Sequence, residues 1–333
     1  MREKVAVVGA GIIGLASALL LAEEGLSVSL IAREFPGDGG IGWASPYAGA
    51  TLIPPPEMGQ KEMAKESIAW YQRLAKEDPS SGVRTVKATE YFTDRDNDDS
   101  IWYKDIMPDY KLLPQGVLPP GCKVGYSFQT CLANPEVFLP WLKTKLEGLG
   151  VKFIRTEIGS LIEAEELTGA SIVVNASGLG AKSLANDAAV AGYRGQTMFV
   201  KSDYDEVRLI NGAEYTYVIP RMFSGGVVLG GISQENNFDD TVDTSLRQDI
   251  LQRVNRMTGN AFAHINLETD VVKDLVGVRP GRKGGIRVEL DGSTVHAYGF
   301  KGAGYVYSFG AAAKVKRLVL ATLQSPRTGL AKL

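Results

Sequence analysis

The chain has 333 residues, a length that favours about two domains. Its 44% hydrophobic and 22% charged residues indicate folded globular cores rather than disorder. The formal net charge of −2 gives no reason to expect nucleic acid or an anionic membrane as a partner.

The chain opens with an apolar strand pattern at 5–8, followed at once by Gly9, Gly11 and Gly14 in GxGxxG spacing. Gly9 permits a tight turn, Gly11 lets the backbone approach a pyrophosphate, and Gly14 lets helix and strand pack closely. The helix that follows would present free N–H groups and the positive end of its dipole to phosphates. A second strand pattern at 27–31 completes a βαβ unit, so the turn predicts dinucleotide binding rather than a purely structural role.

Two charged residues come soon after this second strand. Glu34 lies about 20 residues beyond the last glycine, where a carboxylate that binds the ribose is expected. Its neighbour Arg33 is a second candidate contact to the cofactor. Because the glycine turn interrupts the apolar N-terminal run, that run predicts a buried strand rather than a signal peptide. No stretch has the ~20 apolar residues that span a bilayer.

Further along, periodicity and breaker residues predict the remaining elements. Gly and Pro cluster at 35–59 and predict a loop. Asn134 and Pro135 predict a helix start, with Asn as the cap and Pro at the first helical position. Helices are expected over about 60–76, from 135 to 148 or 150, over 245–258 and over about 308–323. Strands are expected at 85–93, 151–154, 171–175, 196–200, 217–220, 226–231 and 294–299.

A second turn of small residues, Ala176–Ala181, follows the strand pattern at 171–175. After a separate GxGxxG unit, small residues at a strand end predict a second contact with the nucleotide. Nucleotide-like units therefore lie at the start, the middle and the end of the chain. We expect a discontinuous dinucleotide-binding domain, made of residues 1–50, 134–192 and 275–333. The mostly antiparallel remainder, residues 51–133 and 193–274, would form a substrate-binding domain.

Cysteine and histidine are scarce. Cys122 and Cys131 lack metal or redox spacing, which favours two ordinary thiols in a reducing compartment over a disulfide. His296 lies in an apolar strand pattern that predicts a structural role, and His264 lies near a helix end. Neither a histidine-based triad nor a metal site is expected. If the protein is an enzyme, its reactive atoms would belong to a cofactor.

Together these motifs resemble the FAD-dependent D-amino-acid oxidases, especially the fungal ones, over nearly the full length of the chain. The resemblance implies an α/β fold: a doubly wound, Rossmann-like FAD domain, discontinuous in sequence, with an antiparallel-sheet substrate domain. The segments that carry it are 7–15, 44–50, 102–106, 174–181, 217–221, 276–280 and 296–300 with the glycine-rich turn after it. No role is assigned to 102–106. Residues expected to contact noncovalent FAD are Gly9, Ala10, Gly11, Ile12, Ile13, Gly14, Arg33, Glu34, Ala44, Ser45, Ala48, Gly49, Ala50, Ser177, Gly178, Arg279, Gly302, Gly304 and Tyr305.

The resemblance also implies the chemistry. A D-amino acid gives its α-hydrogen as hydride to the flavin, the imine hydrolyses to a 2-oxo acid and ammonia, and oxygen is reduced to hydrogen peroxide. Arg279 matches an arginine that clamps the substrate carboxylate, a task for which a guanidinium fork suits better than a lysine. Tyr217 matches a tyrosine that supports the same carboxylate, and Gly302 falls where a backbone group lies near substrate and flavin. The alternatives are a surface ion pair for Arg279 and core packing for Tyr217.

One departure bears on the substrate. Ser233 stands where some fungal members place a second tyrosine and where D-aspartate oxidases carry an arginine. This favours neutral or apolar D-amino acids, with Tyr215 a substitute for the missing tyrosine and Phe238 a wall of the pocket. Arg221 or Lys301 would be the source of any second positive charge. The rivals are a D-aspartate oxidase, a glycine or sarcosine oxidase, an NAD(P)-dependent dehydrogenase, and a non-catalytic dinucleotide-binding protein.

The last three residues, Ala331-Lys332-Leu333, resemble the Ser-Lys-Leu peroxisomal address. An enzyme that makes peroxide gives such an ending a reason, whereas a chance ending is the alternative. We therefore expect recognition by the peroxisomal import receptor and a peroxisomal location. The loop between Val288 and Thr294 is short, so the dimer that some yeast members form through a long loop there is not implied, and the oligomeric state stays open.

Overall fold

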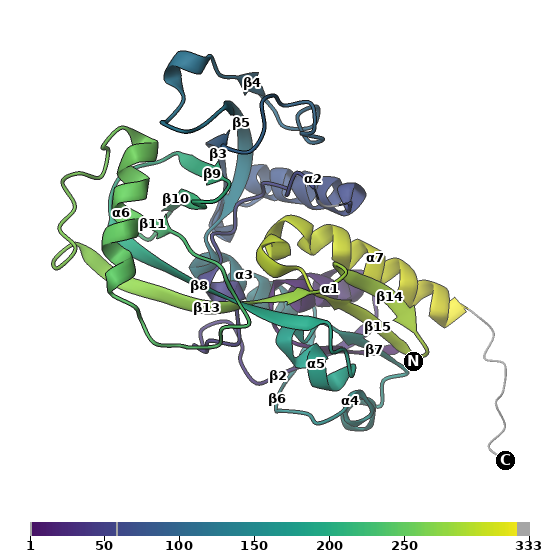
Figure 1. The fold of residues 1–333 in the computed structure, drawn as a ribbon. Helices are drawn as coiled ribbons and strands as arrows, with labels where there is room; N and C mark the ends of the chain where they lie inside the picture. Colours follow the sequence, from purple (N-terminus) through teal and green to yellow (C-terminus); the bar gives the residue numbers. More distant parts are fainter. Residues whose placement is uncertain (1, 58, 325–333) are drawn as a thin grey trace.

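The computed structural model describes residues 2–57 and 59–324. Within them the chain builds a six-stranded and a nine-stranded sheet, which lie side by side with helices between and around them (Figure 1). The strands of the smaller sheet, in spatial order, are β14 (Arg287–Asp291), β15 (Thr294–Tyr298), β7 (Ile172–Asn175), β1 (Lys4–Val8), β2 (Ser27–Ala32) and β6 (Lys152–Arg155). All of its pairs are parallel except the hairpin of β14 and β15.

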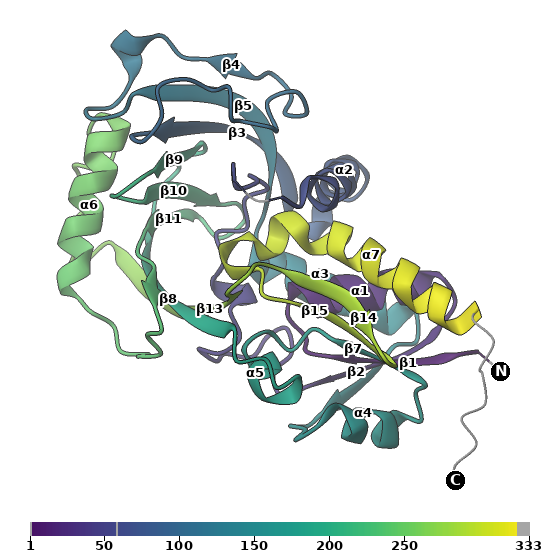
Figure 2. The same cartoon turned by 45° about the vertical axis from the view of Figure 1, so that its right-hand side comes forward.

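The smaller sheet is covered on both faces, as a parallel sheet requires. Val5 and Val7 of β1 pack in one core with α1 (Ile12–Glu23), whereas Ala6 and Val8 face the core that holds α4 (Leu161–Thr168). The long helices α3 (Pro135–Gly148) and α7 (Gly304–Gln324) lie on the α1 side, and the short helix α5 (Ala181–Leu184) lies away from them (Figures 1 and 2). This burial on both faces explains why residues 5–8 of β1 are all apolar.

The larger sheet is antiparallel apart from one pair. Its order is β12 (Gln234–Glu235), β8 (Val190–Lys201), β11 (Gly226–Gly230), β10 (Thr216–Arg221), β9 (Val207–Asn211), β3 (Val83–Phe92), β5 (Val124–Ala133) and β4 (Lys111–Leu112), while β13 (Val271–Arg282) pairs with β8. Only β3 and β9 run parallel to one another. One face of this sheet packs under α6 (Ser245–Thr258), through Val218 and Val254 among others. The opposite face carries Tyr217 and Ile219 toward the smaller sheet.

Helix α2 (Lys61–Glu77) connects the two halves, because it packs both on β3 and on α7. The rings of Trp70 in α2 and Phe309 in α7 stack with their centroids 3.3 Å apart. The backbone N–H of Gly310 in α7 donates to Ser67 Oγ in α2 at 2.9 Å, so the two helices are in close contact at this point. Helix α2 thereby links β3 of the larger sheet to α7, which packs on β14 and β15 of the smaller sheet.

The structure confirms the predicted fold class and most predicted elements. Asn134 caps α3, since its side chain accepts a hydrogen bond from the Glu136 N–H. The predicted start of the last helix was wrong, because α7 begins at Gly304 rather than near 308. The strands β5, β9, β13 and β14 were not predicted. Cys122 and Cys131 are both free thiols.

Strands β8 and β13 run without interruption across the expected domain boundaries near 192 and 275, and both belong to the larger sheet. The exact boundaries stay a prediction. No helix within the part of the chain that the structure describes has the length and apolar character needed to cross a membrane.

Candidate active site

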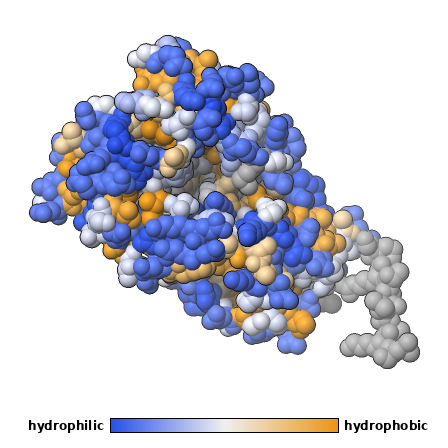
Figure 3. Space-filling view, in the orientation of Figure 1, coloured by the Kyte–Doolittle hydropathy of each residue, from blue (hydrophilic) through white to orange (hydrophobic). Residues whose placement is uncertain are grey.

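A cavity of about 540 Å³ lies between the two sheets. One side is formed by the turns after β1, β2, β7 and β15, where the carboxyl ends of these strands meet. The other side is formed by β8, β10 and β13 of the larger sheet. In the orientation of Figure 1 the molecular surface is largely hydrophilic and is hollowed near its centre (Figure 3). A ligand in this cavity would touch residues from the start, the middle and the end of the chain.

The first glycine turn is shaped for close backbone approach. Gly9 has a φ of +104°, and a Cβ there would collide with the carbonyl oxygen of Ala176 in the turn after β7. Gly11 precedes α1 without a side-chain cap, and the N–H of Ile12 donates to Ser45 Oγ at 2.9 Å. The positive end of the α1 dipole therefore faces the cavity, which suits a pyrophosphate.

The second turn is held by Asn175 at the end of β7. Its side-chain oxygen accepts from the N–H of Ser177 at 3.2 Å and from the Ser177 hydroxyl at 2.6 Å. The same side chain lies 3.3 Å from His296 Nδ1, which is buried. Burial, followed by the charge of Arg287, lowers the pKa of His296, in keeping with the predicted structural role. Ser177 and Gly178 line the cavity beside Gly9.

Charged residues mark the end of the cavity after β2. Arg33 and Glu34 both line it, and Arg33 Nε lies 3.6 Å from Glu34 Oε2. Arg33 Nη1 also donates to Glu157 Oε1 at 3.2 Å. Glu157 was missed by sequence reasoning, because it follows the edge strand β6 and belongs to no motif.

The loop 44–50 crosses from the nucleotide end toward the larger sheet. Tyr305 at the start of α7 donates its hydroxyl hydrogen to the Ser45 carbonyl at 3.0 Å, and Arg221 Nη2 donates to the Ala48 carbonyl at 2.7 Å. Gly49 lies against Ile219, where a Cβ would collide with the isoleucine side chain. Trp43, which no motif indicated, lines the cavity and donates from Nε1 to the Ala10 carbonyl at 3.2 Å. The loop is thus fixed to both sheets.

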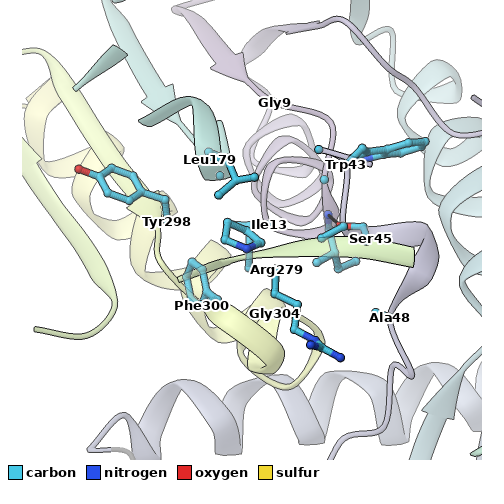
Figure 4. Close-up of a pocket in the computed structure, with 18 of the residues that line it drawn as sticks. Gly9, Ile13, Trp43, Ser45, Ala48, Leu179, Arg279, Tyr298, Phe300 and Gly304 are labelled. Carbon is cyan, nitrogen blue, oxygen red and sulfur yellow. Dashed lines mark hydrogen bonds between the residues drawn. The ribbon is translucent and has the colours of Figure 1, made fainter. Parts of the chain in front are cut away.

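The opposite end of the cavity holds the predicted substrate residues. Arg279 extends from β13, and its guanidinium points away from Tyr298 (Figure 4). Its Nη1 donates to the Ile232 carbonyl at 3.1 Å. Gly195 on β8 makes room for this guanidinium, because a Cβ there would lie 2.5 Å from both terminal nitrogens. A Cβ on Gly302 would lie 3.9 Å from Arg279 Cδ, so Gly302 lies beside the same side chain.

Tyr217 completes this end. It is 5% exposed and lines the cavity, and its ring centroid is 5.3 Å from that of Tyr215 in an edge-to-face pair. Thr197, Leu275 and the Ile219 side chain line the neighbouring surface. Ile219 belongs to the segment 217–221 that the family resemblance indicated. Thr197 and Leu275 were not singled out from the sequence, since they are ordinary strand residues that strand register brings to the cavity.

The predicted residues map closely onto this cavity. Every residue expected to contact FAD or to clamp the substrate carboxylate lines it except Gly14, which lies beneath the turn, where a Cβ would collide with the Gly9 carbonyl. Two suggestions about the substrate end were wrong. Ser233 is exposed, and Phe238 is 56% exposed and lies against Gly192 rather than on the cavity. β11 ends at Gly230, and the chain then pairs with the edge of β8 at Gln234 and Glu235, away from β10.

Two turns of small residues at strand ends, a helix N-terminus, a carboxylate after β2 and the loop 44–50 fit an elongated dinucleotide with a flat ring system. FAD would be held by the turns after β1 and β7 at its pyrophosphate and by the loop 44–50 at its flavin. Among the described residues no group of three or more His, Cys, Asp or Glu side chains is placed to hold a metal ion.

Comparisons with known proteins agree with this geometry. The sequence matches the family described as FAD dependent oxidoreductase over residues 4–318. It is 33% identical to a D-amino-acid oxidase of Fusarium vanettenii, covering 96% of this chain and 97% of the relative. It is 34% identical to a D-amino-acid oxidase of Schizosaccharomyces pombe, covering 92% and 93%. The fold is similar to the crystal structure of glycine oxidase from Geobacillus kaustophilus, with a TM-score of 0.78, 19% identity and coverage of 99% and 98%.

The family match spans almost the whole chain, and the two turns and the loop of the cavity are formed by the matched residues. The chain therefore belongs to the family of FAD-dependent oxidoreductases.

Proposed function

We propose that this flavoenzyme is a D-amino-acid oxidase, which converts a D-amino acid, oxygen and water to a 2-oxo acid, ammonia and hydrogen peroxide. The proposal rests on one observation: Arg279, Tyr217 and Gly302 line one end of a cavity whose other end fits a dinucleotide. Hydride acceptance from the α-carbon and reoxidation by oxygen are the chemistry that FAD supplies when bound. The identity to curated D-amino-acid oxidases over more than nine tenths of the chain supports the same assignment.

The protein's own task is to bind and orient the substrate. Arg279 has five N–H donors, and the Ile232 carbonyl engages one of its terminal nitrogens. The remaining donors suit a carboxylate at the cavity, in the two-pronged geometry that a guanidinium allows. The Tyr217 hydroxyl, which has no hydrogen-bond partner among the described residues, would add a further bond to the same carboxylate. A clamped carboxylate fixes the direction in which the α-hydrogen points.

We further propose that the preferred substrates are neutral or apolar. The surface beside Tyr217 is formed by Thr197, Ile219 and Leu275, which are uncharged. The cations among the described residues that line the cavity are Arg33, at the nucleotide end, Arg279 and Lys301. The Lys301 ammonium lies 4.1 Å from the Tyr193 ring centroid, and Arg221 does not line the cavity. A second substrate carboxylate would therefore meet no fixed guanidinium.

The test is a peroxide-release assay of the purified protein over D- and L-amino acids, glycine and sarcosine. D-Alanine, D-valine or D-methionine should exceed D-aspartate in kcat/KM, and the L-enantiomers should be inactive. Faster turnover of D-aspartate than of every neutral substrate would assign the protein to the D-aspartate oxidases. Glycine or sarcosine as the best substrate would assign it to that rival class.

A peroxisomal location is also proposed, on the ending Ala331-Lys332-Leu333, which lies outside the described residues. A fluorescent protein fused upstream of residues 325–333 should enter peroxisomes in a eukaryotic host, and deletion of Leu333 should leave it in the cytosol. Diffuse fluorescence with the intact ending would mean that the ending is coincidental.

A further inference from the structure

Arg253 lies behind the substrate end of the cavity, on the face of the larger sheet opposite Tyr217. It projects from α6, which covers β10 and β11 on the side away from the smaller sheet (Figure 2). Its side chain is 8% exposed, whereas its partner Asp249, one turn earlier, is 55% exposed. A buried guanidinium at this place is costly unless its donors are satisfied, so its hydrogen bonds show what it holds.

The Arg253 guanidinium joins the ends of two neighbouring strands. Its Nη1 donates to the Tyr215 carbonyl at 2.8 Å and to Thr216 Oγ1 at 2.9 Å, at the start of β10. The Gly231 carbonyl, just beyond the end of β11, accepts from Nη1 and Nη2, each at 3.4 Å. Asp249 Oδ2 accepts from Nε at 3.0 Å and from Nη2 at 2.8 Å, which fixes the plane of the guanidinium.

Both strand ends carry substrate-site residues on their other face. A Cβ on Gly231 would lie 2.7 Å from the Tyr217 hydroxyl oxygen, so the Tyr217 ring rests on this glycine. The next residue, Ile232, accepts the hydrogen bond from Arg279. Between Gly231 and the pairing of Gln234 with Arg194 on β8, the chain has no strand partner. Gly231 is held at its N–H, which donates to the Tyr215 carbonyl at 3.4 Å, and at its carbonyl, which accepts from Arg253. The position of the Ile232 carbonyl follows from these anchors at Gly231.

We propose that Arg253 is a positioning residue of the substrate site, which sets the places of Arg279 and Tyr217 by holding the Tyr215 and Gly231 carbonyls from the far side of the sheet. This inference rests on the proposed function only in the choice of substrate. The arrangement predicts that a change in α6, outside the cavity, acts on carboxylate binding rather than on flavin binding.

The test compares Arg253→Met and Arg253→Lys with two control variants of α6. Val254→Ala removes buried side-chain volume against the sheet without touching the strand ends, so it controls for lost stability. Arg256→Met removes an exposed arginine that pairs with Glu214, so it controls for lost charge. Each is prepared as the FAD-loaded protein. The measurements are the Kd of benzoate, followed by flavin absorbance, and KM and kcat for D-alanine. Benzoate is a carboxylate without an α-hydrogen and cannot be oxidised.

We expect Arg253→Met to raise the benzoate Kd and the D-alanine KM roughly tenfold, with kcat/KM falling by up to about 100-fold. Arg253→Lys should be affected less, since an ammonium keeps the charge but cannot hold both strand ends. Both controls should keep wild-type benzoate Kd and KM, even where the melting temperature of Val254→Ala falls. The FAD content of all four should equal that of the wild type.

An unchanged benzoate Kd in flavin-loaded Arg253→Met would overturn the proposal, as would an equal rise in Val254→Ala. If Arg253→Met does not fold, the benzoate Kd of flavin-loaded Arg253→Lys is compared with that of the wild type instead, and an unchanged Kd would likewise overturn the proposal. Benzoate binding requires no turnover, so it tests the positioning role separately from the reaction. Failure of the proposed function would appear as wild-type protein that binds benzoate but releases no peroxide with D-amino acids.

Discussion

The Arg279 guanidinium lies against Gly195 of β8 and donates a hydrogen bond to the Ile232 carbonyl, just after β11. Removing one member of a desolvated charge pair costs about 2–5 kcal/mol. At about 1.4 kcal/mol per decade, Arg279→Leu should lower kcat/KM for D-alanine by roughly 30- to 4,000-fold. Tyr217→Phe loses a single hydroxyl contact, so it should have a smaller effect, mainly on KM. Steady-state kinetics check both, with flavin absorbance as the control for bound cofactor. Near-normal kcat/KM in a folded, yellow Arg279→Leu protein would show that Arg279 does not bind the substrate carboxylate.

Gly195, which lies against the Arg279 guanidinium, allows a second test at a single residue. Gly195→Ala would place a methyl carbon 2.5 Å from both terminal nitrogens of Arg279, so the side chain must move. A displacement of about 1 Å near the reacting centre can cost about 100-fold in rate, and we expect a loss of that order in kcat/KM with FAD still bound. Gly116→Ala is the control, because nothing lies within 4 Å of a Cβ there. Equal kinetics of the two variants would show that the close approach does not matter.

At the scale of elements, strand β3 carries a buried carboxyl that no motif explained. Glu90 is 1% exposed, and it accepts from the Tyr103 hydroxyl at 2.7 Å and from Asn211 Nδ2 at 3.0 Å. Tyr103 lies in the segment 102–106, to which the sequence assigned no role, so this segment contributes one residue to a buried hydrogen-bond network. The Tyr126 hydroxyl lies 2.9 Å from that of Tyr103 and extends the network.

Burial raises the pKa of Glu90 from 4.5 to about 7, with the hydrogen bonds from Tyr103 and Asn211 acting against the rise. The folded state therefore binds this proton more tightly than the unfolded chain does. Protonation of Glu90 therefore stabilises the folded state fully below about pH 4.5. As the pH rises through about 7 this contribution is lost, and the free energy of unfolding falls by about 3 kcal/mol. Glu90→Gln cannot titrate, so urea unfolding should show the wild type losing stability relative to it between pH 5 and pH 8. A constant difference between the two proteins across that range would contradict this reading.

Elements marked by a local sequence pattern could be predicted, whereas elements defined by pairing with a distant strand could not. The first βαβ unit has a local pattern of an apolar strand, spaced glycines and an apolar helix, so it was predicted together with its ligand class. Strand β13 mixes Lys273, Asp274 and Pro280 with apolar residues and is defined by its pairing with β8, so periodicity alone missed it. Arg279 within it was found only through the family resemblance.

The same distinction holds for the cavity. Its turns are specified by residues close in sequence, whereas Leu275, Thr197 and Glu157 reach it through register and strand order. The suggestions about Ser233 and Phe238 failed because a strand end does not reveal the direction in which the chain leaves. For β11 that direction is set by pairing of Gln234 and Glu235 with β8.

For the whole molecule, we expect FAD to be held without a covalent bond and to stabilise the fold. The cavity contacts both sheets, and a ligand that binds only the folded state adds about 2.7 kcal/mol at 100 times its Kd. Denaturing the holoprotein should release all flavin into the filtrate, and the melting temperature of the apoprotein should rise with added FAD. Gly11→Val should abolish most of that rise, because a side chain would intrude on the approach of the phosphates. Flavin that stays with the precipitated chain would show a covalent link.

The cavity's walls include Gly9 after the first strand and Tyr305 in α7, and the Tyr305 hydroxyl anchors the loop at Ser45. During synthesis the glycine turn leaves the ribosome long before β15 can insert between β7 and β14. A nascent chain thus exposes half of a cofactor site for most of its translation. We therefore expect full affinity for the cofactor only after α7 has emerged, which would make flavin loading a late event in the synthesis of this chain.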